Sequence, residues 1–431
     1  MNLIKKNYLD PDFFINSLII FLPISFIVGN LAINLNVILI IFFSFLFYRK
    51  NIFKIKLFFF EKLLITIFAF SFLTAAINSF IYNSNIDTLN NINTYTLNKT
   101  FAFLRFLFFY FVLKFLVEKK IFNFKFFFFS ASLFSIFVSI DLIYQLIVGK
   151  DIFGFPITSF KLSGPFGDEE IAGSYLQRFS IFSFFLITIY FSKLGSKNQF
   201  TIFFLLLSLF FYSIFLSGNR MPIIIFFLFW IFLFIFEEKL RRFIIPFLGT
   251  MAVLVYLIVS LNDQVNNYTL HFLRITLQIF EFLPELISSE SITQFPNTYI
   301  KEFYSGFNAW QENIFIGGGI NSFHYNCIKT VNACASHPHN YYLEILSEHG
   351  LIGMLLWSSV FFYVIYVSII KKYIFRSNFQ NNNLITPFAI LFLVEIFPVK
   401  TTGSFFTTGN ATYIFFLIAV IIALSRKSQY N

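Results

Sequence analysis

Charged residues are scarce in this chain. Of its 431 residues, 12% are Asp, Glu, Lys or Arg and 58% are hydrophobic, whereas about 25% of the residues of a soluble domain are charged. This shortage excludes a soluble globular protein. Long runs without charge recur along the chain, and each can cross the roughly 30 Å hydrocarbon layer of a membrane as a helix. The sequence therefore predicts an all-α, polytopic membrane protein.

Cysteine and histidine are also rare, and they are confined to one part of the chain. The two cysteines, Cys327 and Cys334, are separated by six residues, and all five histidines lie between positions 271 and 349. The cysteines either form a disulfide in an oxidising compartment or remain free thiols. A metal site that adds His324, His337 and His339 fits poorly, because zinc ligand pairs are usually separated by about two to four residues. No metal and no cofactor is predicted.

Twelve apolar segments are candidates for membrane-spanning helices. With the N-terminus in the cytoplasm, the segments facing inward hold 20 of the 31 Lys and Arg residues, and those facing outward hold 8. This asymmetry follows the positive-inside rule, so the net charge of +10 indicates topology and no nucleic-acid partner. Both termini are predicted to be cytoplasmic, and the first segment lacks a signal-peptide cleavage site. The predicted spans are 13–30, 32–48, 63–80, 101–117, 126–148, 175–191, 200–216, 221–236, 243–260, 351–370, 384–399 and 411–424.

The longest polar stretch, residues 261–345, is predicted to lie outside. It carries apolar periodic patches and Trp310, so we expect a folded, partly helical loop. Two smaller outer loops, 83–100 and 149–173, accompany it. No internal repeat, low-complexity linker or second soluble domain is found in the sequence. The expected architecture is one transmembrane helical bundle of about twelve spans with one large outer loop.

The segment 336–353 carries the sharpest local signal. Pro338 favours an extended or first-turn geometry and Asn340 is a good N-cap, so a helix is predicted to begin just after His339. Backbone N–H groups at such a start attract phosphate and favour neutral imidazole, the form of histidine that acts as a general base. Gly350 and Gly353 allow a tight turn or a close helix approach at the membrane. A capped juxtamembrane helix with an incidental histidine is the alternative.

These residues resemble the O-antigen ligase and polymerase superfamily of bacterial membrane glycosyltransferases. His339-Asn340, followed after nine residues by Gly350 and after two more by Gly353, is similar to the ligase signature. The resemblance divides the chain into 1–160, membrane helices similar only in hydropathy, and 161–431, a ligase-like membrane domain that includes the loop 261–345. Three further stretches agree: 216–220 resembles the family's Ser-Gly-x-Arg step, 309–319 its Trp-to-Gly-x-Gly segment, and 163–176 its Gly-x-Phe-Gly stretch.

The resemblance implies transfer of a glycan from a polyprenyl (undecaprenyl) diphosphate carrier to an acceptor hydroxyl. By the same resemblance, the reaction is expected at the periplasmic face of the bacterial inner membrane, without a metal or a nucleotide. The expected partners are the carrier-linked glycan, its acceptor and membrane lipid. His339 is the implied general base, since an unperturbed histidine has a pKa of about 6.5. Arg220, which matches the family's Arg after Ser-Gly, and Arg274, the only Arg between 261 and 345, are the expected diphosphate-binding cations.

Further residues are predicted to bind substrate beside these three. Arg178 follows the acidic cluster 168–170 and has an alternative role as a structural ion pair with it, because intramembrane charge is costly unless it is partnered or functional. Arg105, Asp141 and Glu395 are intramembrane charges of the same kind. The predicted substrate-binding residues are Arg178, Asn219, His337, Asn340 and Trp310.

The identity of the acceptor stays open. A ligase joins the glycan to lipid A–core, whereas a polymerase joins it to another carrier-linked repeat, and both use the same base and leaving group. The signature from His339 to Gly353 favours the ligase, and the acidic cluster 168–170, which departs from the Asn-containing version of many ligases, leaves the polymerase open. A glycosidase-like acidic pair and a secondary transporter are weaker alternatives, because transporters are usually built from repeated halves and the halves differ here.

Overall fold

The computed structural model describes residues 10–81, 90–157, 161–191, 193, 195–238, 241, 244–246, 249, 253, 256, 260, 298–330, 335–375, 383–401 and 403–427. Over these residues the protein is helical and has no strand beyond an isolated bridge between Lys150 and Pro156. The elements are α1 (Pro11–Ile20), α2 (Leu22–Val28), α3 (Asn30–Tyr48), α4 (Lys50–Phe53), α5 (Phe59–Ile81), α6 (Asn90–Phe103), α7 (Arg105–Glu118), α8 (Phe124–Val148), η2 (Gly164–Phe166), α9 (Ala172–Phe179), α10 (Ile181–Phe185), η3 (Leu186–Tyr190), α11 (Ser196–Leu216), α12 (Arg220–Phe236), α15 (Thr298–Gln311), α16 (Phe323–Thr330), α17 (Tyr341–Ile365), η6 (Tyr366–Ile374), α18 (Ile385–Glu395) and α19 (Thr408–Lys427).

Seven helical segments of this described part are long and apolar enough to span a membrane. α1 and α2 form an eighth candidate, bent by 40°, because Pro23 has no N–H to donate to the carbonyl of Ile19. The predicted span 175–191 is divided into α9, α10 and η3, and most of 243–260 lies outside the described residues. The protein is therefore a multi-pass membrane protein, while the count of about twelve spans stays a prediction. The seven segments are Asn30–Tyr48, Phe59–Ser79, Tyr95–Glu118, Phe124–Val148, Ser196–Leu216, Tyr341–Ile374 and Thr408–Arg426.

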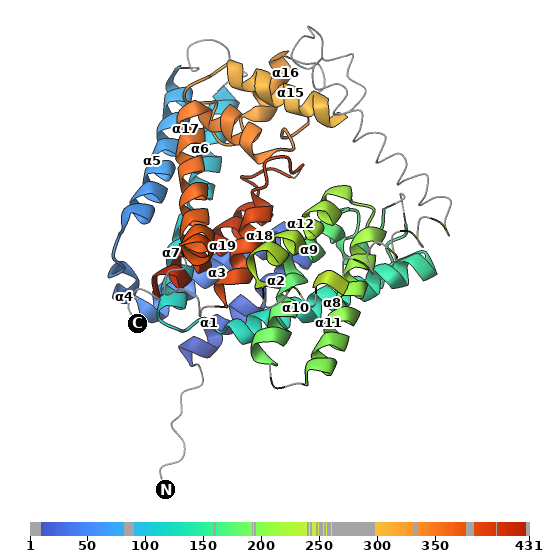
Figure 1. Cartoon of the computed structure of the whole chain (residues 1–431). Helices are drawn as coiled ribbons and strands as arrows, with labels where there is room; N and C mark the ends of the chain where they lie inside the picture. The colour runs from blue at the N-terminus through green and yellow to red at the C-terminus, as the bar shows by residue number, and fades with distance from the viewer. Residues whose placement is uncertain are drawn as a thin grey trace.

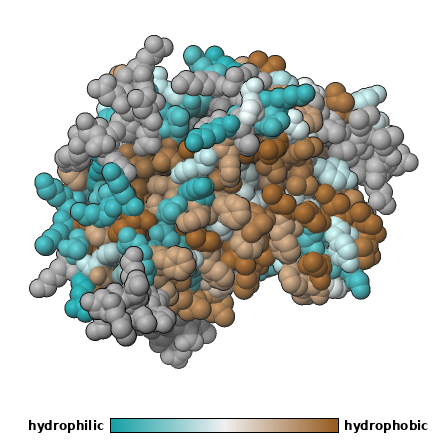
Figure 2. All heavy atoms as spheres, turned by 90° about the horizontal axis from the view of Figure 1, so that it is seen from below, coloured by the Kyte–Doolittle hydropathy of each residue, from teal (hydrophilic) through white to brown (hydrophobic). Residues whose placement is uncertain are grey.

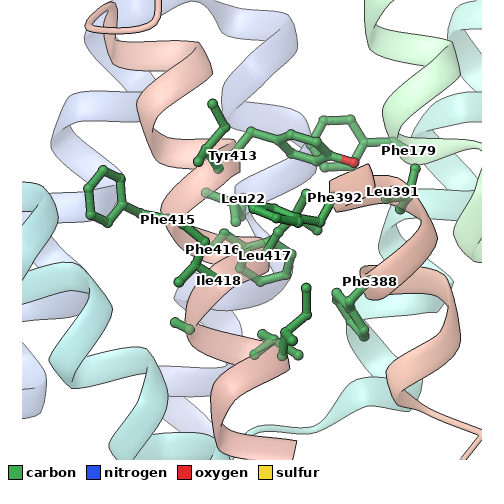
Figure 3. Packing of buried hydrophobic residues seen from close by; sticks show 14 of the residues in the cluster. Leu22, Phe179, Phe388, Leu391, Phe392, Tyr413, Phe415, Phe416, Leu417 and Ile418 are labelled. Atoms are coloured by element: carbon green, nitrogen blue, oxygen red, sulfur yellow. The ribbon is translucent and has the colours of Figure 1, made fainter. Parts of the chain in front are cut away.

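α19 is the central helix of the bundle. Its membrane-length segment is 83% buried inside the protein, and it packs against α3, α7 and α18. Figure 3 shows Phe416 and Leu417 of α19 among Phe388 and Phe392 of α18. A helix with protein on every side needs no polar stripe, which explains why α19 is apolar all round.

The surface of the bundle is apolar where a soluble protein would be polar. Figure 2 shows hydrophobic side chains gathered across the middle of one face, with hydrophilic residues toward its margins. Leu31, Ile147 and Phe13 are 83%, 77% and 71% exposed. Such exposure would favour aggregation in water, but it fits contact with lipid acyl chains.

α5 and α17 lie side by side and connect two ends of the molecule (Figure 1). At one end, Asn78 of α5 donates to the Gly317 carbonyl at 3.0 Å, beside the helices α15 and α16. At the other end, Glu61 of α5 binds Arg426 of α19. The helical rise between Glu61 and Asn78 is about 25 Å. We call these the upper end and the lower end, because they are so placed in Figure 1.

Candidate active site

A cavity of about 260 Å³ opens among the connections that the sequence predicts to lie outside. Its apolar wall comes from Phe26, Ile33 and Ile225. Among the residues that the structure describes, those that line the cavity include none from the basic segments predicted to face the cytoplasm. The polar wall comes from predicted outer connections and the adjoining ends of predicted spans, and it includes Asn30, Glu169, Ser174, Lys400 and Asn410.

A buried ion cluster forms part of this wall. Arg178 Nη2 lies 2.6 Å from Glu395 Oε1, and Arg178 Nε lies 3.2 Å from Glu395 Oε2. The Arg178 guanidinium also donates to Asn410 Oδ1 at 2.8 Å. Lys400 Nζ lies 2.7 Å from Glu395 Oε1. Arg178 therefore pairs with Glu395, and the predicted ion pair with the cluster 168–170 is wrong. Two cations share the Glu395 carboxylate in this cluster, and a second carboxylate, that of Glu169, also lines the cavity.

Lys400 is poised to change its charge near neutral pH. Burial lowers the pKa of Lys400, the Glu395 carboxylate opposes this change and the Arg178 guanidinium adds to it, and the resulting pKa is about 8. The Tyr341 hydroxyl donates to Glu395 Oε1 at 2.9 Å. The first residue of α17 is thus bonded directly to the cluster that lines the cavity.

Asn340 caps α17 and joins it to the Lys400 loop. Its Oδ1 accepts from the backbone N–H groups of Tyr342 and Leu343 at 3.0 and 3.2 Å, so the predicted N-cap is confirmed. Its Nδ2 donates to the Pro398 carbonyl at 2.8 Å. The residue that follows His339 is therefore held against the loop that carries Lys400.

His339 has a strained backbone and an acidic neighbour. Its φ is +51°, and its Nε2 lies 3.5 Å from Glu302 Oε2, with the two side chains 31% and 16% exposed. The rings of His337 and His339 are 4.2 Å apart between centroids. Burial raises the pKa of Glu302 to about 7. An imidazole and a carboxyl group whose pKa lies near neutrality thus meet beside the start of α17.

Two stretches that carry the family resemblance pack on each other. Gly319 N donates to the Glu348 carbonyl at 2.7 Å, and Leu351 N donates to the Ile314 carbonyl at 2.8 Å. Gly350 interrupts α17 with φ +62°, and a Cβ there would lie 2.3 Å from the Phe315 carbonyl carbon. The predicted close approach at Gly350 is confirmed.

Trp310 and Gly353, which the sequence analysis also singled out in these stretches, make contacts that stabilise the local fold. The Trp310 indole donates to the Ile314 carbonyl at 2.9 Å and closes a turn, and Trp310 is not a lining residue of the cavity. A Cβ at Gly353 would clash with His349 one turn earlier and would lie 3.3 Å from Phe70 Cε1 of α5, so α5 also approaches closely here. Gly353 thus leaves room for a side chain of its own helix.

The remaining predicted stretches meet at the start of α12. Asn219 Nδ2 donates to the Glu170 carbonyl at 2.6 Å, and a Cβ at Gly173 would lie 2.4 Å from Ser217 Oγ. Arg220 is the first residue of α12, and the next residue, Met221, lines the cavity. Arg274 lies outside the described residues.

The sequence did not single out four residues of this region. Tyr175 and Gln177 line the cavity and are 4% exposed. Tyr175 Oη and Gln177 Oε1 are buried and have no hydrogen-bond partner among the described residues. Lys400 is the only cation between the last two predicted spans, which is a signal, whereas nothing in the sequence around Glu302 distinguishes it from other surface carboxylates.

The structure bears on whether the cysteines form a disulfide or remain free thiols, because Cys327 lies in α16. Cys327 is disulfide-bonded, and Cys334, the other cysteine of the sequence, lies outside the described residues. Across 10–81, 90–157 and the other described ranges, no three His, Cys, Asp or Glu residues are grouped to hold a metal ion.

Comparison with known protein families gives a match to part of the chain. Residues 203–358 match the O-antigen ligase family model. The matched O-antigen ligase region runs from within α11 to within α17, so it contains the motif stretches 216–220 and 309–319 and the signature from His339 to Gly353. The predicted resemblance to the O-antigen ligase superfamily is confirmed, and the stretch 163–176 lies outside the match. No curated protein matches the chain.

Proposed function

We propose that this protein transfers a glycan from an undecaprenyl diphosphate carrier to lipid A–core at the periplasmic face of the bacterial inner membrane. The O-antigen ligase region supports a membrane glycosyltransferase of the ligase or polymerase type. The observation that carries the proposal is the joining of the cation-lined cavity to the start of α17, where Asn340 binds the Lys400 loop and Tyr341 binds Glu395. A base and phosphate-binding cations then serve one reaction centre.

The cations of the cavity have the chemistry that a diphosphate needs. Arg178 and Lys400 line the cavity with one carboxylate between them. Arg220 at the start of α12 and Arg274 in the outer loop are the cations that the family resemblance adds. Guanidinium groups bind phosphate oxygens with two parallel hydrogen bonds, and cations stabilise the negative charge that develops on a departing diphosphate. His337 and Asn219 complete the proposed substrate contacts.

The proposed step breaks one bond and forms one. The acceptor hydroxyl gives its proton to neutral His339, and its oxygen bonds to the anomeric carbon of the glycan. The bond between that carbon and the carrier's phosphate oxygen breaks, and its electron pair leaves with the diphosphate. Protein groups supply the base and the charge stabilisation, so the step as drawn uses no metal.

Transfer by His339 variants tests the mechanism. The purified protein in lipid vesicles is given a carrier-linked glycan and lipid A–core, and product is measured on a gel. His339→Ala should lower the rate by about 10²- to 10⁴-fold, because a general base contributes that much. His324→Ala, in α16 outside the cavity lining, is the matched control and should keep the wild-type rate. Wild-type transfer by His339→Ala would contradict the assignment of the base.

Deletion of the gene for this protein in its host distinguishes the two possible acceptors, lipid A–core and another carrier-linked repeat. Loss of the whole surface lipopolysaccharide ladder indicates a ligase, whereas one repeat attached to core indicates a polymerase that joins carrier-linked repeats. Solute uptake into vesicles without any carrier would indicate a transporter instead.

A further inference from the structure

Arg105 of α7 differs from the other cations inside the bundle. Its side chain contacts the Ala102 carbonyl, Thr408 Oγ1 and the Phe106 ring, and it contacts no carboxylate of the described residues. An intramembrane charge is costly unless it is partnered or functional. Arg105 therefore needs an anion that this part of the chain does not supply. Five other cations of the bundle lie 2.6 to 3.1 Å from a glutamate oxygen: Lys114, Arg178, Lys372, Lys400 and Arg426.

The guanidinium of Arg105 lies at the predicted outer edge of the hydrocarbon layer. Nη1 donates to the carbonyl of Ala102, three residues earlier, at 2.6 Å, so the side chain points toward the outer end of its helix. Nη2 donates at 3.2 Å to Thr408 Oγ1, at the start of α19. Ala102 is the second residue of the predicted span 101–117, and Thr408 precedes the predicted span 411–424. Lipid phosphates lie at this boundary.

Hydrogen-bond donors predominate around this guanidinium. Thr408 Oγ1 donates to Asn34 Oδ1 of α3 at 3.4 Å, so Arg105, Thr408 and Asn34 form one chain across three helices. A guanidinium has five N–H groups. Two of them are used in the chain and at Ala102, and Nε is buried without a partner. One N–H on each terminal nitrogen is left, and the Asn34 amide adds N–H donors. These donors match a phosphate, which accepts hydrogen bonds and carries negative charge.

The donors lie beside a surface that is open to lipid. Phe101 and Phe108, four residues before and three residues after Arg105, share its helix face and are exposed. On α3, Leu31 lies one turn before Asn34 and is also exposed. α3 and α7 pack on each other. A lipid headgroup at Arg105 would therefore have apolar surface beside it for its acyl chains.

This place is separate from the cavity. Thr408 accepts from Arg105, whereas Asn410, two residues further along α19, accepts from Arg178 in the cavity wall. Two residues rotate a helix by about 200°. The first turn of α19 thus separates Arg105 from the cations of the cavity.

We propose that Arg105, Asn34 and Thr408 bind the phosphate group of a lipid in the outer leaflet. The phosphate accepts from the guanidinium and from the Asn34 amide, and Thr408 holds both side chains in place. A membrane phospholipid and the phosphorylated lipid A of an acceptor share this chemistry, and the experiment distinguishes them. The site does not depend on the proposed glycan transfer.

The test measures lipid binding to the whole purified protein in detergent by native mass spectrometry. The probes are phosphatidylglycerol, lipid A, and a diacylglycerol that has the acyl chains of the phosphatidylglycerol and no phosphate. The wild type should bind at least one phosphorylated lipid more tightly than diacylglycerol. Arg105→Gln should lose at least about tenfold in affinity for that lipid, as expected for loss of hydrogen bonds from a charged donor. Lys99→Gln removes a positive charge from the same end of the molecule, where Lys99 lies over the Tyr95 ring, and this control should bind as the wild type does.

The outcomes identify the lipid or refute the site. A loss of phosphatidylglycerol binding in Arg105→Gln identifies a membrane phospholipid, and a loss confined to lipid A identifies the acceptor. Unchanged binding of both, or an equal loss in Lys99→Gln or for diacylglycerol, overturns the inference. If Arg105→Gln does not fold, Asn34→Leu and Thr408→Val should each lose severalfold, and unchanged affinity in both overturns it. Absence of glycan transfer would refute the proposed function and leave this result standing.

Discussion

Two of the buried ion clusters share the same four residue types and lie near opposite ends of α19, where Arg178 binds Asn410 and Glu61 binds Arg426. Each consists of one glutamate that binds one arginine through two nitrogens, one lysine and one tyrosine hydroxyl. In the upper cluster, Glu395 binds Arg178, Lys400 and Tyr341. In the lower cluster, Glu61 binds Arg426, Lys114 and Tyr110, at 2.7, 3.1 and 2.8 Å.

The clusters differ in what surrounds them. The upper cluster borders the cavity through Arg178 and Lys400. The lower cluster is closed by aromatic side chains: the Arg426 guanidinium lies 4.3 Å from the Phe58 ring centroid and Lys114 Nζ lies 5.9 Å from it. Buried charges must be fully partnered to be tolerated. The lower cluster ties the ends of α5, α7 and α19 together, whereas the upper one, in the proposed function, also presents cations to a ligand. Composition does not distinguish the two roles, but access does.

The largest expected difference is between two arginine variants. Arg178→Lys and Arg426→Lys each keep the charge and lose the paired hydrogen bonds, so each should cost about 1.5–3 kcal/mol of unfolding free energy. Arg178→Lys should also lower transfer per folded molecule by about a hundredfold, because it removes the guanidinium N–H groups that Glu395 and Asn410 leave available to a diphosphate. Thermal unfolding in detergent and transfer rates measure the two effects. An equal loss of transfer in Arg426→Lys would show that the two clusters do not differ in their role in transfer.

The pH dependence of the KM distinguishes the lysine of the upper cluster, Lys400, from that of the lower cluster, Lys114. The pKa of Lys400 is lowered from 10.5 to about 8, so its charge is lost as the pH rises through 8, and the KM for the carrier-linked donor should rise about tenfold between pH 7 and pH 9. The unfolded chain binds more protons than the folded one between pH 8 and 10.5, so the free energy of unfolding rises with pH across that window, as the cost of burying a charged lysine is relieved. Lys400→Met should show a high KM that does not change with pH. Lys114→Met, in the lower cluster, should keep the wild-type pH profile of the KM, and a flattened profile would show that the two lysines are not different.

The smallest effects are expected at the two unpartnered groups of the cavity wall. Gln177→Leu and Tyr175→Phe should each raise the KM for the donor severalfold, as expected for loss of one hydrogen bond of about 0.5–1.5 kcal/mol to a glycan or phosphate. Stability should not fall, because neither atom has a partner in the described structure to lose. A lower unfolding temperature with unchanged KM would mean that both side chains serve packing alone.

Local features were predictable from the order of residues. Apolar runs predict membrane helices because crossing a bilayer requires length and hydropathy alone, and seven of the predicted spans coincide with candidate spans of the structure. The Asn340 cap and the turn at Gly350 depend on neighbouring residues, and both were found where they were predicted. The predicted partner of Arg178 was wrong because the nearest carboxylates in sequence are not the nearest in space.

The amino-acid sequence by itself determined that this is a helical membrane protein and that a helix begins just after His339. Both properties are set within a few turns of chain. Tertiary structure alone decided that Arg178 meets Glu395, 217 positions away, that Lys400 shares this carboxylate, and that Glu302 reaches His339. Such pairings depend on which helices pack together. Side-chain volumes across the whole bundle set that packing, because a buried charge is stable only where the fold brings it a partner.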